Sequence, residues 1–211
     1  MADDRAEIRP YRSADLDDLY RICLQTAADG QDATTLFSDP MLPGHVFAAP
    51  YGIFEPSLAW VAEDSAGAAG YILGALDTRA FEERLARDWW PALRARYPEP
   101  GQVTAAVPEL ELLTLQAIHQ PFITNPALVS SYPSHLHIDL LPRLQGRGFG
   151  RRLIETLLAA LRASGSCGVH LHVGRGNQRA AEFYRHVGLT ELPAAGRPRV
   201  FVMKLAEQTS L

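Results

Sequence analysis

One segment constrains the fold of this chain more than any other: a strand candidate that leads through a glycine-rich turn into a helix. The strand is expected over 134–141 and ends at Pro142. The turn, 145–150, has three alternating glycines, so its backbone N–H groups can converge without obstruction from Cβ atoms. The helix expected over 151–163 adds the free N–H groups and partial positive charge of its N-terminus. This arrangement predicts an anion site suited to a pyrophosphate.

Glycine-rich turns bind phosphates in three common designs, and two of them fit this turn poorly. A P-loop needs Lys followed by Ser or Thr after its last glycine, but two arginines follow Gly150. A dinucleotide fingerprint needs different glycine spacing and an acidic residue where the next strand ends, and there Gly174 and Arg175 stand. A nucleotide-dependent oxidoreductase is therefore only a weak hypothesis.

The third design is that of the GNAT superfamily of N-acetyltransferases, which this chain resembles. The coenzyme A motif of that family is Arg/Gln-x-x-Gly-x-Gly/Ala, and the turn 145–150 matches it in full, directly after the expected strand. The stretch 177–189 resembles the second family signature, Asn-x-x-Ala-x-x-Phe-Tyr-x-x-x-Gly-Phe/Leu. Both motifs occur in the order and spacing typical of the family.

A wider likeness covers nearly the whole chain. It is to the acetyltransferase-like C-terminal domain of O-GlcNAcases and to stand-alone bacterial relatives of that domain. The segments that carry it are 29–32, 36–40, 70–77 and 89–91. The resemblance implies an α/β fold with a mixed central sheet, a splayed strand pair and helices on both faces. It implies a single GNAT domain over 1–211, with a helical insertion over 78–132 before the coenzyme-binding strand.

Hydrophobic periodicity and turn residues predict the remaining elements. Strands are expected over 7–11, 58–63, 69–76, 169–173 and 199–205. Helices are expected over 14–28, 109–119, 178–187 and, divided at Pro91, over 78–97. The stretch 29–57 is rich in Asp, Gly and Pro, and we expect a functional loop or short helices that line a site.

The resemblance also implies roles for individual residues. Tyr184 lies where the family places a tyrosine near the coenzyme sulfur, and its phenol can donate a proton to the leaving thiolate. Asp139 is the first candidate for the base that accepts the proton of the ammonium, and His137 is the second. Many enzymes of the family bind an amine that is already neutral. Asn177 can bond the pantetheine arm or cap the following helix. The other coenzyme-binding candidates are Leu140, Leu141, Gln145, Gly146, Arg147, Gly148, Phe149, Gly150 and Arg151.

The implied activity is transfer of an acetyl group from acetyl-CoA, the cosubstrate, to a primary amine of an unknown acceptor by direct attack, without a metal. The alternative is a catalytically silent GNAT-fold module that binds coenzyme A or a protein partner. The residues expected to build the acceptor side are the acidic Asp29, Asp32, Asp39 and Asp77 and the aromatic Phe37, Tyr51, Phe54 and Trp90.

Composition limits the partners. A net charge of -4 argues against a protein that wraps nucleic acid. No apolar run approaches the ~20 residues needed to cross a bilayer, and no signal-peptide pattern follows the acidic start. Cys23 and Cys167 are too few for a disulfide framework and lack metal-ligand spacing. We therefore expect a soluble cytoplasmic protein, a monomer or homodimer, with no nucleic-acid or membrane partner.

Overall fold

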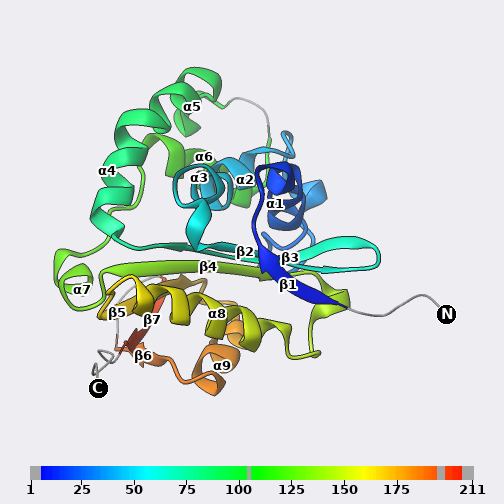
Figure 1. The fold of residues 1–211 in the computed structure, drawn as a ribbon. Coiled ribbons are helices and arrows are strands. Elements are labelled where there is room, and N and C mark those ends of the chain that lie inside the picture. Colours follow the sequence, from blue (N-terminus) through cyan, green and yellow to red (C-terminus); the bar gives the residue numbers. More distant parts are fainter. Residues whose placement is uncertain (1–5, 104–105, 194–197, 206–211) are drawn as a thin grey trace, which may run out of the picture.

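The computed structural model describes residues 6–103, 106–193 and 198–205. These residues form one mixed sheet of seven strands in the order β1-β2-β3-β4-β5-β7-β6 (Figure 1). Every pairing is antiparallel except that of β4 with β5. The strands are β1 (Glu7–Pro10), β2 (Ala59–Asp64), β3 (Gly67–Ala75), β4 (Ser134–Leu140), β5 (Gly168–Val173), β6 (Thr190–Leu192) and β7 (Arg199–Lys204).

Helices cover both faces of this sheet, as the sequence predicted. Figure 1 shows α1 to α6 on one side of the sheet and α8 and α9 on the other. The helices are α1 (Leu16–Leu24), α2 (Leu42–Phe47), α3 (Ala49–Phe54), α4 (Thr78–Asp88), α5 (Trp90–Arg96), α6 (Glu109–His119), α7 (Pro126–Ser131), α8 (Phe149–Ala163) and α9 (Gln178–His186). Within the described ranges, no helix combines the length and apolar character that crossing a bilayer requires.

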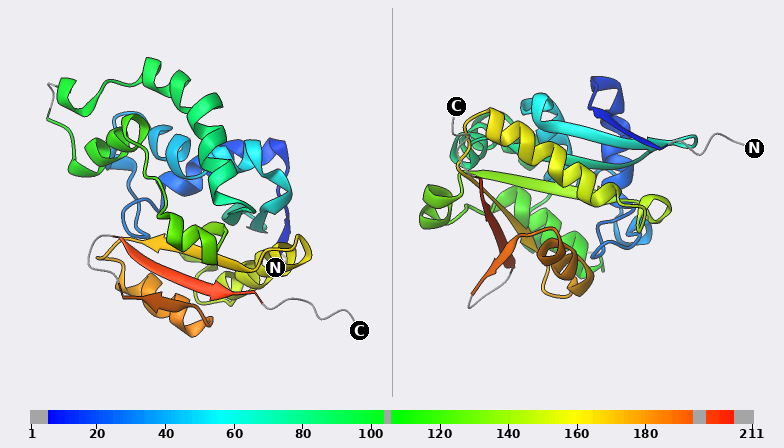
Figure 2. Two further views of the ribbon diagram at one scale, coloured as in Figure 1. Left: turned by 90° about the vertical axis from the view of Figure 1, so that its left-hand side faces the viewer. Right: turned by 60° about the horizontal axis from the view of Figure 1, so that its bottom comes forward.

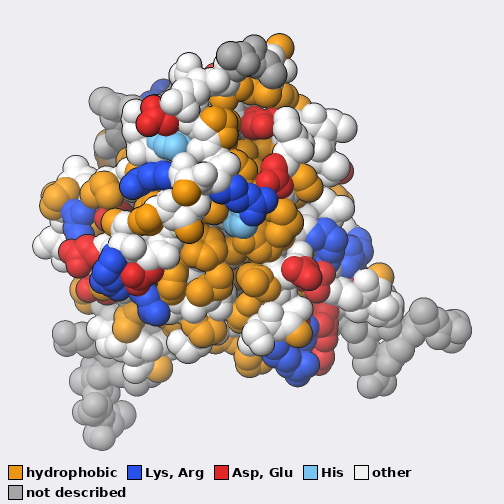
Figure 3. All heavy atoms as spheres, turned by 90° about the horizontal axis from the view of Figure 1, so that it is seen from above, with side chains coloured by type: hydrophobic (Ala, Val, Ile, Leu, Met, Phe, Trp, Pro, Cys, Tyr) orange, Lys and Arg blue, Asp and Glu red, His pale blue; other side chains and the backbone are white. Residues whose placement is uncertain are grey.

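The helical layer over the upper face has its own hydrophobic core. Phe81, Trp90 and Ile118, from α4, α5 and α6, are buried together with Leu42 of α2. Pro91 stands in the first turn of α5, and the helix division expected there is confirmed. Seen from above, hydrophobic side chains gather in the middle of this layer and charged side chains surround them (Figure 3). The helical layer therefore packs on the sheet around a hydrophobic core of its own. Its helices α4 to α6 come after β3 in the chain.

The strands of the parallel pair separate soon after they meet. Strands β4 and β5 align only at Ser134–Val169 and His135–His170, although both strands continue for several residues. The right-hand view of Figure 2 shows them diverging from that shared end. Helix α8 makes the crossover between them, as parallel neighbours require. The splayed pair, the mixed sheet and the two helical layers confirm the predicted fold class.

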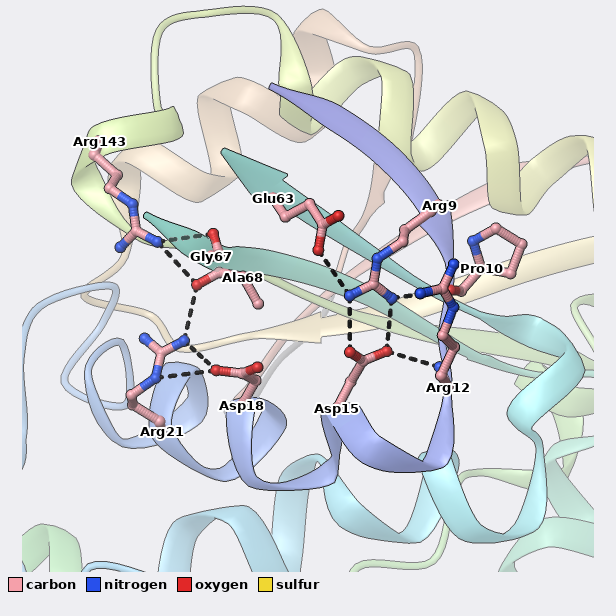
Figure 4. A network of polar contacts seen from close by, with 10 residues as sticks. All are labelled: Arg9, Pro10, Arg12, Asp15, Asp18, Arg21, Glu63, Gly67, Ala68 and Arg143. Atoms are coloured by element: carbon pink, nitrogen blue, oxygen red, sulfur yellow. Dashed lines mark hydrogen bonds and ion pairs between the residues drawn. The ribbon is translucent and has the colours of Figure 1, made fainter. Parts of the chain in front are cut away.

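Arginine side chains fasten the start of the β4–α8 connection to the β2–β3 hairpin. Arg143 Nε lies 2.9 Å from Asp64 Oδ2, and its Nη2 donates to the carbonyl oxygen of Ala68 at 2.9 Å. Arg21 of α1 donates to the same carbonyl at 2.8 Å (Figure 4). Three separate segments therefore meet at one backbone oxygen, which fixes where the chain leaves the sheet toward α8.

Several element boundaries in the sequence prediction are wrong. The first helix ends at Leu24 rather than at 28, because a tight turn follows in which 28 and 31 form an isolated bridge. Helix α8 begins at Phe149 rather than at 151, because Gly148, with a φ of 82°, is its N-cap. The sequence also did not predict α7 or β6. With six and three residues, these are too short to show a hydrophobic period.

Candidate active site

The turn between β4 and α8 presents backbone amides at a helix N-terminus. Gly146 and Gly148 have φ values of 71° and 82°, which L-residues with a Cβ rarely adopt. The N–H of Arg152 is the one that bonds back to the carbonyl of Gly148, at 3.2 Å. The three N–H groups before it, at 149–151, therefore have no acceptor within the helix. A Cβ at either glycine would meet no atom within 4 Å, so the turn faces open space.

The third glycine of the motif is needed for packing. Gly150 is helical, and a Cβ there would lie 3.0 Å from Cζ of Phe183 and 3.4 Å from Cδ1 of Leu140. Contacts of 3.0 Å are tighter than real Cβ atoms tolerate without movement of the neighbour. Gly150 thus lets α9 and β4 approach the first turn of α8, and α9 is the helix that carries Tyr184.

Arginines border the turn while contacting other parts of the chain. The guanidinium of Arg151 donates to a carbonyl of α9 at 3.3 Å, and that of Arg152 lies 4.9 Å from the ring centroid of Phe149. Arg147 donates to the carbonyl of Arg143 at 3.4 Å. Their charges add to the partial positive charge of the helix N-terminus. The N-terminal end of α8 is therefore an electropositive surface lined by backbone amides.

The gap between β4 and β5 exposes one backbone edge of β4. Leu141 donates its N–H to Ala69 of the neighbouring chain segment at 2.8 Å and accepts at its carbonyl from Leu144 at 3.0 Å. Because successive residues of a strand direct their N–H and C=O groups to opposite edges, Leu140 and Ile138 face the gap. Of the two leucines predicted to offer backbone groups, Leu140 faces the gap, whereas both groups of Leu141 are already bonded.

Gln145 connects this edge to α9. Its Nε2 donates to the carbonyl of Leu140 at 2.6 Å, and its Oε1 accepts from Arg179 at 2.8 Å. The side chain of the first motif residue therefore bridges the strand and the helix on the two sides of the gap. The N–H of Leu140 and the backbone groups of Ile138 face the gap as well.

Asp139 belongs to a polar cluster on the face of β4 that α1 covers. Its Oδ2 accepts a 2.5 Å hydrogen bond from the hydroxyl of Tyr71 on β3. Burial and the charge of Asp139 raise the pKa of Tyr71 well above its ordinary value, so the phenol stays protonated and donates. His137 Nε2 lies 3.1 Å from the same Oδ2 but makes no hydrogen bond within the described residues. The carboxylate is thus held in place by Tyr71.

Cys23 of α1 completes this cluster. Ligand atoms of Cys23, His137 and Asp139 all lie within 4.8 Å of one another, and zinc uses these residue types. Metal binding needs a thiolate, however, and burial raises the pKa of the Cys23 thiol. With the carboxylate also bonded to Tyr71, the cluster suits a fixed carboxylate better than a metal centre. The absence of a metal from the reaction stays a prediction.

Tyr184 lies within electrostatic reach of Asp139. It is buried, and desolvation together with the charge of Asp139 raises its pKa, so the phenol is neutral at neutral pH. It packs against the ring of Phe201 with centroids 5.5 Å apart. Leu189 donates its N–H to the carbonyl of Tyr184 at 2.9 Å, just past Gly188, whose φ of 95° ends the helix. Tyr184 therefore lies close enough to Asp139 to feel its charge, and the catalytic roles of both residues stay a prediction.

Asn177 has a structural role in this site. Its Oδ1 accepts from the N–H of Ala180 at 3.0 Å and so caps α9. This is one of the two roles that the sequence left open, and it is confirmed. The other role, contact with the pantetheine arm, stays a prediction.

Most residues expected on the acceptor side have other roles. Asp32 bonds its own loop, Asp77 caps α4, and Asp39 pairs with an arginine of α5. Phe37 and Trp90 are buried in the core of the helical layer, so the prediction that they form site walls is wrong. The acidic character expected of the acceptor side is correspondingly smaller than the sequence suggested.

Four histidines occupy one face of the splayed pair instead. The ring centroids of His135 and His170 lie 5.7 Å apart, and those of His170 and His172 lie 5.5 Å apart. His137 follows on β4. Desolvation lowers the pKa of His135 to about 3, that of His172 to about 4, and also that of His170. These three imidazoles are therefore uncharged at neutral pH.

We expect this histidine group to make the fold sensitive to mild acid. The unfolded chain binds a proton on each histidine near pH 6.5, whereas folded His135 binds one only near its pKa of about 3. Between these values the unfolded state holds more protons, so the free energy of unfolding falls with falling pH. For His135 alone the loss is about 2 kcal/mol between pH 7 and pH 5. Urea unfolding at both pH values should show a smaller loss for His135→Gln. Two results would contradict this explanation. In one, His135→Gln loses as much free energy of unfolding between pH 7 and pH 5 as the wild type does. In the other, His186→Gln, at an exposed position, reduces this loss as much as His135→Gln does.

Comparison with known proteins identifies the family to which this fold belongs. Residues 127–189 match the model of the acetyltransferase (GNAT) family. The solved structure of SsHAT is 40% identical to this chain, with a TM-score of 0.84, over 96% of this chain and 99% of that one. This chain belongs to the GNAT acetyltransferase family.

Other relatives of this GNAT chain are more distant. Protein O-GlcNAcase of Rattus norvegicus is 27% identical over 187 residues, which are 88% of this chain and 20% of that protein. The chain thus spans about a fifth of the length of this relative. A phosphinothricin acetyltransferase from Sinorhizobium meliloti, solved in complex with AcCoA, has the same fold at a TM-score of 0.56 and 16% identity, over 97% of this chain and 90% of that one.

Proposed function

We propose that this protein is an acetyl-CoA-dependent N-acetyltransferase that transfers the acetyl group to a primary amine. One observation carries the proposal: the amide-lined turn 145–150 lies where the exposed edge of β4 meets α8. The pyrophosphate of the coenzyme binds the turn and the arginines beside it. The pantetheine arm lies along β4 as an added strand would, on the N–H of Leu140 and the carbonyl of Ile138. The AcCoA complex of the Sinorhizobium meliloti relative supports this choice of ligand.

In the proposed reaction the amine attacks the bound thioester directly. Asp139 accepts a proton from the incoming ammonium, itself or through a water, and the nitrogen forms a bond to the acetyl carbon. A backbone N–H stabilises the oxyanion of the tetrahedral intermediate. As the carbon–sulfur bond breaks, Tyr184 donates its proton to the coenzyme thiolate, and the nitrogen loses its second proton to water, so that the neutral amide forms. The phenolate of Tyr184 then takes a proton back from solvent. Holding amine and thioester together supplies much of the acceleration, and no covalent enzyme intermediate is needed.

Removing the phenol of Tyr184 is expected to slow the chemical step. In Tyr184→Phe the ring still fills the buried site, but the leaving thiolate has no positioned donor. General-acid contributions of this kind are typically about 10²-fold or more. Coenzyme thiol release at saturating acetyl-CoA should therefore show a lower kcat with unchanged acetyl-CoA affinity. A Tyr184→Phe enzyme with wild-type kcat would remove Tyr184 from the mechanism.

A screen of primary amines with acetyl-CoA tests the proposal, with free coenzyme thiol as the readout. Thiol release that depends on both the amine and the protein supports an acetyltransferase. Binding of acetyl-CoA without release for any amine would instead favour the silent coenzyme-binding module. Failure to bind acetyl-CoA would rule out both of these accounts and leave a GNAT-fold module that binds a protein partner.

A further inference from the structure

Two exposed aromatic side chains flank the face of the strand pair that carries the histidines. Phe47, at the end of α2, stacks on His137 of β4 with ring centroids 6.3 Å apart and planes 30° apart. Phe122, in the segment before α7, meets His172 of β5 edge-on, with centroids 5.1 Å apart. The exposed fractions of the two phenylalanines are 40% and 61%. Each diverging strand therefore carries one aromatic–imidazole pair that solvent can reach.

The two pairs stand on opposite sides of the gap. His135 and His170 form the last aligned position of β4 and β5, and His137 and His172 are the next residues on the same face of each strand. Asp139 follows His137 by two residues and so shares this face, with its Oδ2 3.1 Å from His137. An acceptor that approaches Asp139 from this face passes the aromatic–imidazole pairs.

Few unpaired charges lie near this approach. Glu82 of α4 acts on His170 and opposes the lowering of its pKa, but this carboxylate is paired with Arg79 at 3.3 Å and accepts from the N–H of Thr124 at 2.8 Å. Desolvation and the neighbouring His170 lower the pKa of His172 to about 4, so at neutral pH that ring is a neutral aromatic surface. Asp29 lies against the glycines at 174 and 176, just after the end of β5. Asp32, Asp39 and Asp77 are used by their own loops and helices. A peptide with several lysines would need more carboxylates than this face offers.

We propose that the acceptor is a primary amine joined to an aromatic ring by a short chain. The ring lies against Phe47 and Phe122, and the amine reaches Asp139. Aromatic rings favour offset-stacked and edge-on contacts of the kind that the two phenylalanines already make with histidines. One carboxylate matches one amine. This inference rests on the proposed acetyl transfer and adds the chemical class of the acceptor to it.

A comparison of kcat/KM values for three amines tests the inference. Coenzyme thiol release is measured with phenethylamine, with butylamine and with a lysine-containing peptide. We expect kcat/KM for phenethylamine to exceed that for butylamine by about tenfold or more. Phe47→Ala and Phe122→Ala should each reduce this ratio severalfold. Phe122→Leu, which keeps an apolar side chain but loses the ring, should reduce it as well. Leu113→Ala, at a position on α6 that is 54% exposed, should leave the ratio unchanged.

The outcomes separate this inference from the proposed function. Butylamine or the peptide acetylated as well as phenethylamine would overturn the aromatic acceptor and leave acetyl transfer standing. A ratio that stays constant in all three phenylalanine variants would do the same, provided that thermal unfolding shows the variants folded. Acetyl-CoA binding without transfer to phenethylamine would overturn the aromatic acceptor, and failure across the whole screen of primary amines would overturn acetyl transfer as well.

Discussion

Gly148→Glu is expected to weaken acetyl-CoA binding by about a hundredfold or more. The glycine has a φ of 82°, and a glutamate there would be strained and would place its carboxylate at the amides proposed to hold the pyrophosphate. At ~100 times its dissociation constant, a ligand adds roughly 2.7 kcal/mol to the stability of the folded state. The unfolding midpoint of the wild type should then rise by several degrees, at about 2–4 °C per kcal/mol. At the same acetyl-CoA concentration the variant should show no rise.

Gly165→Glu is the matched control for that experiment. Gly165 has a φ of 81°, and a Cβ there would also meet no atom within 4 Å. It lies just beyond the opposite end of α8, so the substitution brings the same backbone strain and the same charge far from the turn. The control should be destabilised to a similar degree and keep its rise with acetyl-CoA. A rise retained in Gly148→Glu, or lost equally in both variants, would contradict the assignment of the turn.

Asp139→Asn is expected to lower kcat/KM for the amine by about 10²-fold or more, because the positioned proton acceptor is lost. The asparagine keeps the shape of the side chain, and its oxygen can still accept from the hydroxyl of Tyr71. Acetyl-CoA affinity should therefore stay near that of the wild type. The rate is measured as thiol release at saturating acetyl-CoA with varied amine, and affinity is measured by thermal unfolding.

Asp88→Asn is the control for the removal of a carboxylate. Asp88 ends α4, where it pairs with Arg87 at the surface, and this substitution should leave the rate unchanged. A wild-type rate in Asp139→Asn would show that the amine arrives already neutral. The role of Asp139 would then be confined to its hydrogen bond with Tyr71.

The glycine turn, the strand before it and the helices around the proposed coenzyme site could be predicted from the sequence because their signals are local. The glycines of the turn, the apolar strand before them and the Asn177 helix occur within short, continuous segments. The splay of β4 and β5 follows from the family resemblance alone, since no local signal marks where two strands separate. In the sequence Gly150 looks like a third glycine of the turn. The structure shows that glycine is needed there because Phe183 packs against it and leaves too little room for a Cβ.

The acceptor side depends on contacts between distant segments, and here the sequence predicts less. The bond between Tyr71 and Asp139 requires the register of β3 against β4, which the sequence does not show. Cys23 reaches the same cluster from α1. The sequence places Phe37 in a loop, but the helical layer buries its side chain. Phe47 is the exposed last residue of α2, a helix of six residues that is too short to be predicted. Side-chain burial in such irregular stretches is decided by tertiary packing.

The most direct test of the proposed chemistry follows an isotope-labelled acetyl group. Wild-type protein is mixed with acetyl-CoA labelled in the acetyl group and with a primary amine, and the quenched reaction is analysed by mass spectrometry. Direct attack predicts the label on the amine, none on the protein, and no labelled product with Gly148→Glu. Label on the protein that then passes to the amine, or no labelled amine at all, would contradict direct transfer at this site.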